Sequence, residues 1–507
     1  MKHIKSNLLD YLCDYWINIK NMKKKSLKEK TIYGAGWSFA DNILGQGITF
    51  LTGLILARLL SPSEYGLIGI ITIFINIFNA IVDSGFSSAL IRDNNSDDDD
   101  YGTMFIVNMG LSFVLFDILF FAAPIISDFF HSSELIPLCR VMGIVVIINA
   151  TAIIQNTYLT KQLDFKTKTK ASFWSSVISG IVGIILAYIG FGVWALVIQQ
   201  IVRQLLNSIL LWYLSNYIVH LNFSLEKFKG MWNFGWKILV SSIVHTVWCE
   251  LTQIVIGRFY SPTTLGYYTR SNQFSCIFSS NLTSVVQRVS YPALSKIQDD
   301  ELKLKMVYVK IIRMTMFITF VLMVGMAACA KSIVLSLLGE KWICSIPFLR
   351  LLCISMMLYP LNALNLTMLE VKGRSDLYLR VEIAKKIILL MPIAVGILIN
   401  IYWMLIANII CSIFCYFINA YYSGRLINYS IIDQVKDLAP SMNLALFLGG
   451  TLFCIDSILE ISPILLLVIE FVVGVIFVFA ISNLLKLEDF LAIKQIVGKF
   501  HFLKTKN

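Results

Sequence analysis

Arg58-Leu-Leu-Ser-Pro-Ser-Glu-Tyr-Gly66 occurs again 200 residues later in the chain as Arg258-Phe-Tyr-Ser-Pro-Thr-Thr-Leu-Gly266. Each copy follows one long apolar run and precedes another. Ser-Pro ends a helix, and the glycine after it permits a tight turn into the next one. Each copy is therefore expected to join two apolar helices.

Further matches extend this repeat along the chain. Ser88-Ala-Leu90 with Arg92 corresponds to Pro292-Ala-Leu294 with Lys296, and Ile136-Pro-Leu-Cys-Arg140 corresponds to Ile346-Pro-Phe-Leu-Arg350. The matches keep the same order in both halves, which predicts a duplicated unit. Each half holds six predicted helices, an even number, so both halves begin on the same side of the membrane. This predicts a parallel repeat about an axis along the membrane normal, with a cavity between the two lobes.

The composition indicates that the solvent of this chain is lipid. Of its 507 residues, 57% are hydrophobic and 14% are charged, whereas soluble chains carry roughly a quarter charged residues. Apolar runs of about 20 residues match the bilayer thickness. The sequence thus predicts an all-α polytopic membrane protein of about fourteen transmembrane helices: two six-helix lobes plus a C-terminal pair. The predicted spans are 33–56, 66–90, 103–126, 135–159, 171–190, 192–214, 232–257, 266–291, 308–330, 343–369, 378–398, 401–423, 440–456 and 461–484.

The positions of the 42 Lys and Arg residues predict the orientation. Most fall in the two tails and in alternate connections, while the opposite connections hold Arg58, Arg258, Lys331 and Lys341. The positive-inside rule then predicts that both termini of this multi-pass membrane protein lie in the cytoplasm. The net charge of +11 reflects this topology and contact with membrane lipid, not nucleic-acid binding. The predicted parts are a basic tail (1–30), an N-lobe (31–215), a C-lobe (228–425), a helix pair (440–484) and a second basic tail (485–507).

Several stretches resemble a known family. They are Gly34-Ala-Gly-Trp-Ser-Phe39, Gly53-Leu-Ile-Leu-Ala-Arg-Leu-Leu-Ser-Pro-Ser-Glu-Tyr-Gly-Leu67, Asp83-Ser-Gly-Phe-Ser-Ser-Ala-Leu-Ile-Arg92, Gln155-Asn156 and Leu163-Asp-Phe-Lys166. These are similar to the polysaccharide-transporter (Wzx-type) flippases of the multidrug/oligosaccharidyl-lipid/polysaccharide superfamily. The resemblance implies a bacterial inner (plasma) membrane transporter that moves a polyprenyl-diphosphate-linked oligosaccharide by alternating access, for lipopolysaccharide, capsule or exopolysaccharide biosynthesis. It implies no catalytic residue and no cofactor beyond coupling to protons or Na⁺, and it makes a polysaccharide polymerase and export machinery the candidate partners.

Cations within the spans are the candidates for substrate binding. Arg binds a phosphate through two hydrogen bonds and Lys acts as a point charge. A charged side chain that faced lipid would cost roughly 2.5–3.5 kcal/mol near the bilayer centre, so these groups should face protein or water. The candidates are Lys237, Arg270, Arg288, Arg203, Arg140 and Arg350. For Arg140 and Arg350, which follow equivalent prolines, snorkelling or helix–helix pairing stays an equal alternative.

Helical periodicity gathers polar residues on single faces of three spans. The faces are Lys237, Ser241, His245, Trp248 and Thr252 in span 7; Arg270, Gln273, Asn281, Ser284 and Arg288 in span 8; and Thr72, Asn76, Asn79, Asp83 and Ser87 in span 2. Such stripes are typical of a polar lumen. A hydrogen-bonded packing role is the favoured alternative for His245, and an interfacial position is the alternative for Trp248, which in a lumen would stack on a sugar.

Carboxylates within the spans are the candidates for ion coupling, because a buried Asp or Glu can bind and release a proton or Na⁺ as its surroundings change. Asp83, Asp41 and Glu250 fit this description. Asp83 has the alternatives of pairing with Arg92 or of capping the end of its span. Glu250 lies opposite the Lys237 stripe, so a bond to a neighbouring helix is its alternative.

Two other patterns carry no chemistry in this interpretation. The run Asp97-Asp98-Asp99-Asp100 is like the Asp-x-Asp of metal-dependent glycosyltransferases, but no α/β domain surrounds it. We expect a solvated acidic cap before span 3, where negative charge suits a helix N-terminus. The ten cysteines form no Cys-x-x-Cys pair and no Cys/His set with metal-ligand spacing, so no metal site is predicted.

Three other functions compete with the flippase. A multidrug exporter of the same superfamily would carry fewer cations and more carboxylates in its lumen. A membrane-embedded polysaccharide polymerase or glycosyltransferase would have a large loop or domain outside the membrane, whereas the longest internal connections here are 215–231 and 292–307. A scaffold protein would leave the intramembrane charges unexplained.

Overall fold

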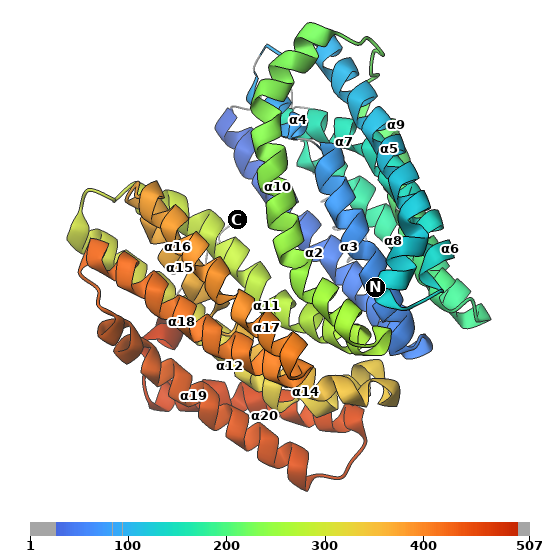
Figure 1. Ribbon diagram of the computed structural model, residues 1–507. Coiled ribbons are helices and arrows are strands. Elements are labelled where there is room, and N and C mark those ends of the chain that lie inside the picture. The colour runs from blue at the N-terminus through green and yellow to red at the C-terminus, as the bar shows by residue number, and fades with distance from the viewer. Residues whose placement is uncertain (1–26, 84, 94, 495–507) are drawn as a thin grey trace, which may run out of the picture. The chain divides into compact units, whose positions relative to one another are not determined.

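The computed structural model describes residues 27–83, 85–93 and 95–494, with backbone alone for 27–35 and 38–43. Within these residues the chain forms helices and no strand (Figure 1). The first half contains α2 (Leu27–Leu59), α3 (Pro62–Asp83), α4 (Phe86–Arg92), α5 (Asp98–Phe130), α6 (Leu135–Met142), α7 (Ile144–Lys161), α8 (Phe165–Ile189), α9 (Val193–Ser215) and α10 (Leu225–Phe259). The second half contains α11 (Pro262–Ser295), α12 (Glu301–Ala328), α13 (Ala330–Ile333), η2 (Val334–Leu338), η3 (Glu340–Ser345), α14 (Ile346–Met356), α15 (Tyr359–Val371), α16 (Ser375–Ile388), α17 (Leu390–Leu398), α18 (Ile401–Ile427), α19 (Ile431–Ile458) and α20 (Pro463–Leu484).

Each of the fourteen predicted spans lies on one of these helices or on consecutive ones. Among the described residues, eleven helical stretches are long and apolar enough to cross a membrane. The class, an all-α polytopic membrane protein, is thus confirmed, while the count of fourteen stays a prediction. The other three predicted spans fall on α2, whose side chains are described only in part, on α11, which is rich in Ser, Thr and amide side chains, and on the broken pair α16–α17.

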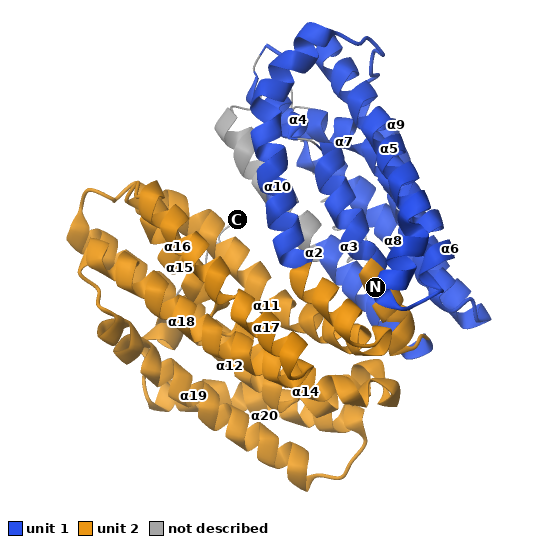
Figure 2. Ribbon diagram, viewed as in Figure 1, with its two compact units in different colours: residues 1–59, 71–250 blue, residues 60–70, 251–507 orange. Residues whose placement is uncertain are grey.

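The chain packs as two compact units (Figure 2). Unit 1 comprises residues 1–59 and 71–250, and unit 2 comprises 60–70 and 251–507. The boundaries fall inside α3 and α10, so the first turns of α3 belong to unit 2 and most of α10 belongs to unit 1. This division describes packing alone, and the predicted lobes, which rest on the sequence repeat, stay a prediction.

Small residues let the helices of unit 1 approach one another closely. α8 packs against both α2 and α9, and α7 packs against α5 and α9. A Cβ added to Gly180 of α8 would lie 2.3 Å from Thr52 of α2, and one added to Gly183 would lie 3.0 Å from Gln199 of α9. Interfaces of this kind are usual between helices in lipid, where association depends on close van der Waals packing.

The C-terminal pair is an integral part of unit 2. α19 packs along α12, and α20 packs along α19. Leu448 and Leu452 of α19 are buried against Ala328 and Cys329 at the end of α12. The predicted appended helices therefore complete the apolar core of this unit.

The two repeated Ser-Pro stretches contact each other within unit 2. A Cβ on Gly66 would lie 1.7 Å from the carbonyl oxygen of Pro262, and a Cβ on Gly266 would lie 1.9 Å from that of Pro62. The first turns of α3 and α11 therefore cross in a reciprocal contact that only glycine allows. This local twofold relation supports the internal repeat that the sequence predicts.

The predicted role of Ser-Pro is confirmed, and that of the glycine is wrong. Helices end at Leu59 and Phe259 and restart at the two prolines. Ser61 and Ser261 cap the new helices; the Ser61 backbone N–H donates to Glu64 at 2.6 Å. The glycines lie inside the first turns of these helices, because the proline and the serine already make the turn. Their role is close backbone approach.

Candidate functional site

The polar stripe predicted on α10 lies on an exposed side of that helix in unit 1. Lys237, Ser241 and His245 are exposed, and Trp248 is half-buried. No described carboxylate lies within 4.0 Å of the Lys237 ammonium. His245 Nε2 lies 3.6 Å from Cys249 Sγ one turn further on, so this ring has a local partner. The structure leaves Lys237 available to an anion, and its role stays a prediction.

Glu250 is buried and bonded to a neighbouring helix. It is 8% exposed and accepts a hydrogen bond of 2.8 Å from Asn76 Nδ2 of α3. This contact matches the alternative interpretation, in which Glu250 bonds a helix that packs against it. It also places one predicted coupling carboxylate against the polar face of α3.

The same face of α3 continues into an amide network. Asn149 of α7 donates to Asn79 at 2.9 Å and accepts from Gln204 of α9 at 2.6 Å. The predicted polar stripe of span 2 is therefore bonded to groups on α7 and α10, and through Asn149 to α9. Buried polar groups in lipid require such partners.

Asp83 lies at a break in the helix. α3 ends at Asp83, and Gly85 adopts a left-handed conformation with φ 69° before α4 begins. The Asp83 carboxylate accepts a hydrogen bond from Ser87, whose oxygen accepts one of 3.0 Å from Thr157 of α7. No described Lys, Arg or His side chain lies within 4.0 Å of this carboxylate. The alternative pairing with Arg92 does not form, because that guanidinium lies 4.7 Å from the centre of the Phe234 ring.

The break is held against α10 by a close backbone contact. A Cβ on Gly85 would lie 2.6 Å from the Gly235 carbonyl oxygen and 2.9 Å from Ile238. Only glycine fits here, both for its positive φ and for this approach. The third coupling candidate, Asp41, is on α2, and its side chain lies outside the described residues.

The two remaining cations of unit 1 differ in their surroundings. Arg203 is exposed on α9. Arg140 of α6 donates from Nε to the Phe120 carbonyl oxygen at 3.4 Å, and its guanidinium lies 4.6 Å from the centre of the Phe120 ring. Arg140 thus fits the helix–helix pairing alternative.

Arg270 is buried in an aromatic site of unit 2. It is 8% exposed, its guanidinium lies 3.8 Å from the centre of the Tyr65 ring, and it donates to Gln273. Tyr65 packs edge-on against Trp342 with the ring centres 5.5 Å apart. Cation–π contacts of this kind stabilise a desolvated cation by about 2 kcal/mol.

Arg288, within one turn of the end of the predicted span 8, is exposed on α11. No described carboxylate lies within 4.0 Å of its guanidinium. Asn281, from the same predicted polar face, is half-buried. Arg288 is thus the counterpart in unit 2 of the exposed Lys237 in unit 1, whereas Arg270 is engaged by protein.

Arg350 takes part in a charge cluster that the sequence analysis missed. Its guanidinium lies 3.8 Å from Asp456 of α19, and Lys331 lies 3.8 Å from the same carboxylate. Asp456 is 5% exposed. Asp456 is the last residue of the predicted span 13, and α19 continues past it to Ile458 with this side chain buried.

Glu470 is the second missed carboxylate of this cluster. It is 1% exposed, it accepts a hydrogen bond from Ser332, and its other oxygen has no hydrogen-bond partner among the described residues. A signal was present in the sequence: Glu470 is the one charged residue of α20, Pro463–Leu484, the most apolar candidate span among the described residues.

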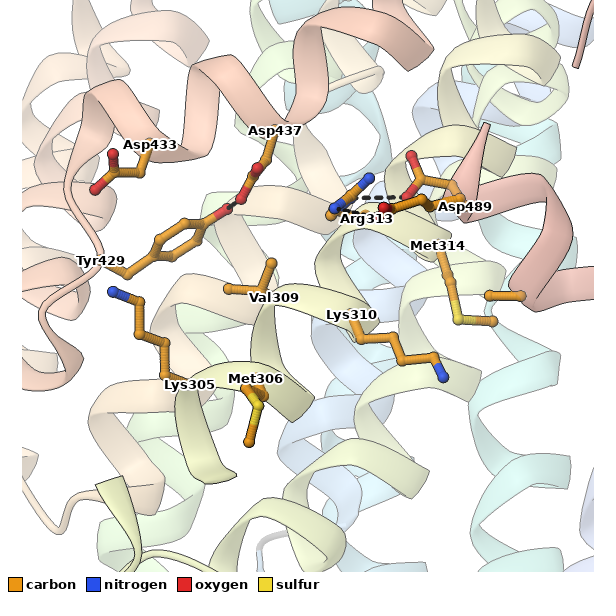
Figure 3. A pocket seen from close by; sticks show the side chains of 12 residues that line it. Lys305, Met306, Val309, Lys310, Arg313, Met314, Tyr429, Asp433, Asp437 and Asp489 are labelled. Carbon is orange, nitrogen blue, oxygen red and sulfur yellow. Dashed lines mark hydrogen bonds and ion pairs between the residues drawn. The ribbon is translucent and has the colours of Figure 1, made fainter. Parts of the chain in front are cut away.

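The opposite end of the C-terminal pair encloses a cavity of about 660 Å³ (Figure 3). It lies among α12, α19 and the segment after α20. Arg313 Nε donates to Asp489 at 2.8 Å, and an Arg313 terminal nitrogen lies 3.1 Å from Glu488. Ser441 of α19 donates to the other Asp489 oxygen at 2.8 Å. Ion pairs therefore hold the C-terminal helix pair at both of its ends, to α12 at this end and to α13 and α14 at the other.

The acidic run caps α5 as predicted. The Asp97 side chain accepts from the Asp100 backbone N–H at 3.1 Å, and the Asp100 carboxylate accepts from the Asp97 N–H at 3.0 Å. The expected solvation holds only in part, because Asp100 is 5% exposed. Lys227 lies 2.9 Å from Asp97 and 3.1 Å from Asp100. The Lys227 hydrogen bond lowers the pKa of Asp97 to about 2.

The run also holds the connection between α9 and α10, a role that the sequence did not indicate. Tyr217 donates to Asp98 at 2.9 Å and Asn222 donates to Asp99 at 3.0 Å. A Cβ on Gly102 would lie 2.1 Å from the His220 carbonyl oxygen, so the connection rests directly on the α5 backbone. Over the described part of the chain, no group of three or more His, Cys, Asp or Glu side chains is arranged to hold a metal ion.

The helices and their buried polar groups define a polytopic α-helical membrane protein with charged groups inside its spans. The model of a family described as polysaccharide biosynthesis protein matches residues 55–347, and the chain belongs to this family.

Two relatives and one solved structure show the range of the similarity. The chain is 25% identical to the lipopolysaccharide biosynthesis protein WzxC of Escherichia coli (strain K12), over 73% of this chain and 76% of WzxC. It is 25% identical to the succinoglycan biosynthesis transport protein ExoT of Rhizobium meliloti (strain 1021), over 63% of this chain and 65% of ExoT. The fold is similar to that of the lipid II flippase MurJ in an inward closed conformation, with a TM-score of 0.70 and 14% identity over 90% of this chain and all of that one. The predicted Wzx-type resemblance is confirmed.

Proposed function

We propose that this protein is a flippase that moves polyprenyl-diphosphate-linked oligosaccharide repeat units across the bacterial inner membrane. The glycan is destined for lipopolysaccharide, capsule or exopolysaccharide. The observation that carries the proposal is the match to a family of polysaccharide biosynthesis proteins, together with the similarity to a relative named as a transport protein. The MurJ-like fold is compatible with it.

The exposed cations support a diphosphate cargo. Lys237 and Arg288 lie within predicted spans, one in each unit, and neither has a described carboxylate within 4.0 Å. A cation kept in a span without a counter-ion is costly unless it meets water or an anion. A diphosphate would supply that anion, and charge-assisted hydrogen bonds to it contribute about 1.5–3 kcal/mol each.

The aromatic and polar neighbours of the cations suit the sugar part of the cargo. Trp248 is half-buried on α10, three turns from Lys237, and Ser241 and His245 are exposed between them. An aromatic ring offers a flat apolar face for a pyranose, while hydroxyl and imidazole groups bond its hydroxyls.

Transport against a gradient requires coupling to an ion, and Asp83 and Glu250 are the described candidates. Asp83 accepts a hydrogen bond from the uncharged Ser87, so it can change its charge without breaking a described ion pair, and Glu250 accepts one from Asn76. We assign coupling to protons or Na⁺ and no other cofactor. A transporter has no catalytic residue, and we propose none.

The proposed orientation places both termini in the cytoplasm, because the basic tails and most basic connections then lie on that side. The acidic run Asp97–Asp100 would then also lie on the cytoplasmic side. Flipped repeat units would pass to a polysaccharide polymerase and export machinery on the opposite side, which we propose as functional partners.

The experiment that tests this class of function is leaflet transfer in proteoliposomes. Purified protein is reconstituted with a fluorescent polyprenyl-diphosphate oligosaccharide, and the fraction of label that reaches the opposite leaflet is measured against protein-free vesicles. We expect transfer that accelerates under an ion gradient. Efflux of a small organic cation without glycan transfer would favour a multidrug exporter, and lengthening of the glycan would favour a polymerase.

A further inference from the structure

Glu470 is a buried carboxylate with no counter-ion in contact. It lies 1% exposed on α20, and no described Lys, Arg or His side chain lies within 4.0 Å of it. Ser332 donates to one of its oxygens, and the other, Oε1, is buried without a hydrogen-bond partner. An ionised carboxylate in such a place carries a large desolvation penalty, whereas a protonated one does not.

The cations near Glu470 pair with another carboxylate, Asp456. Lys331 and Arg350 both lie 3.8 Å from Asp456, which is 5% exposed. Lys331 and Asp456 act electrostatically on Glu470, and the Cys329 thiol also faces it. The elements packed against Glu470 thus present one cation, one carboxylate, one thiol and one hydroxyl, and the second cation, Arg350 of α14, contacts Asp456.

These groups have two arrangements in which every buried charge is compensated. In the first, Glu470 is protonated and Asp456 is shared by Lys331 and Arg350. In the second, Glu470 is ionised and pairs with Lys331, while Asp456 keeps Arg350. The two differ by one proton and by the position of one flexible ammonium group, which is what a two-state element requires.

We propose that Glu470, with Ser332, Lys331 and Asp456, forms a proton-exchange site that locks the C-terminal helix pair to α13. The described structure represents the protonated arrangement. On release, the carboxyl O–H bond breaks, the proton leaves to water beside the half-exposed Lys331, and the Lys331 ammonium moves from Asp456 to the new carboxylate. No oxidant, metal or further reactant is needed.

The ligand is a proton and not a metal cation. A metal ion at Glu470 and Asp456 would have to displace two positive groups that already lie within 4 Å of Asp456, and the soft Cys329 thiol would replace an oxygen ligand. The role of this exchange in driving transport rests on the proposed flippase function, whereas the proton site itself does not.

Infrared difference spectroscopy on the purified full-length protein tests the site without any transport assay. Glu470→Gln keeps the shape and removes the titrating group, and Glu460→Gln, an exposed residue of the α19–α20 connection, is the matched control. At neutral pH we expect the spectrum of Glu470→Gln to lack one carboxylic-acid C=O band of the wild type, which then appears as a positive band in the wild-type-minus-variant difference. The spectrum of Glu460→Gln should retain this band. A difference spectrum that contains only ionised carboxylate would overturn the proposal.

Two further measurements keep the outcome decisive. If Glu470→Gln does not fold, Ser332→Ala removes the hydrogen bond to the acid and should shift the same C=O band to higher frequency; an unshifted band contradicts the site. In proteoliposomes, Glu470→Gln should abolish the acceleration of glycan transfer by a proton gradient while Glu460→Gln retains it. Absence of transfer by wild type would count against the proposed function alone, since the infrared result stands by itself.

Discussion

Arg140 and Arg350 occupy the same position in the two halves of the repeat, yet they meet different partners. Arg140 donates to a backbone carbonyl and lies over Phe120. Arg350 lies over Phe453, with its ring centre 5.3 Å away, and also contacts Asp456. An aromatic contact occurs in both halves, but Phe120 belongs to α5, whereas Phe453 and Asp456 both belong to α19, which has no equivalent in the first half. A duplicated cation has thus acquired an ion pair through the appended helices.

The glycines of the Ser-Pro stretches behave in the opposite way. Gly66 and Gly266 keep the same contact in both copies, each against the other copy's proline carbonyl. Backbone geometry is retained where the two copies touch each other, and side-chain partners diverge where each copy touches something of its own. Equivalence within a repeat therefore predicts backbone arrangement better than it predicts the role of a charge.

The largest effect is expected from breaking the reciprocal contact. Gly66→Ala or Gly266→Ala places a Cβ within 2 Å of a carbonyl oxygen, so the backbone must shift, and we expect each to lower the free energy of unfolding by about 3 kcal/mol or more. Thermal unfolding in detergent measures this loss. Gly450→Ala on α19, where nothing lies within 4 Å of the new Cβ, is the control and should be neutral or slightly stabilising. Equal stability of all three variants would show that the close contact does not exist.

A smaller effect separates the two arginines. Arg350→Gln leaves the buried Asp456 with Lys331 alone, and because Arg350 is 35% exposed we expect a loss of about 2 kcal/mol, below the value for a fully buried pair. Arg140→Gln removes one long hydrogen bond and a cation–π contact, and about 1 kcal/mol should be lost.

A double-mutant cycle makes the comparison sharper. Arg350→Gln combined with Asp456→Asn should destabilise less than the sum of the single changes, since each removes the same pair. Arg140→Gln combined with Asp456→Asn should be additive. Additivity in both cycles would mean that the interaction between Arg350 and Asp456 contributes nothing to the free energy of unfolding.

The positions of most helices could be predicted from the sequence, because a lipid environment restricts which backbone conformations can span it. Apolar runs of fixed length must be helical in a membrane, so the positions of the helices followed from hydropathy alone. The break between Asp83 and Phe86 and the role of Gly66 did not follow, because both depend on contacts with residues 150 or more positions away, Gly235 and Pro262.

For the candidate site, the sequence predicted only which polar residues share a face of a helix. Periodicity predicts which residues share a side of α10, and Lys237, Ser241 and His245 are indeed exposed together. It does not predict partners across helices, such as Asn76 for Glu250. Glu470 was missed because the search concentrated on stripes, whereas a single charge in an otherwise apolar helix forms none.

The central claim is that exposed cations in the spans bind a diphosphate-linked glycan during transfer. Leaflet transfer in proteoliposomes by Lys237→Ala, Arg288→Ala and the control Lys229→Ala tests it most directly. Lys229 is an exposed lysine on the same helix as Lys237 but outside the predicted span. Loss of one charge-assisted hydrogen bond predicts a decrease of about tenfold or more for the first two variants, and no change for the control. Transfer at the wild-type rate by Lys237→Ala and Arg288→Ala would contradict the account.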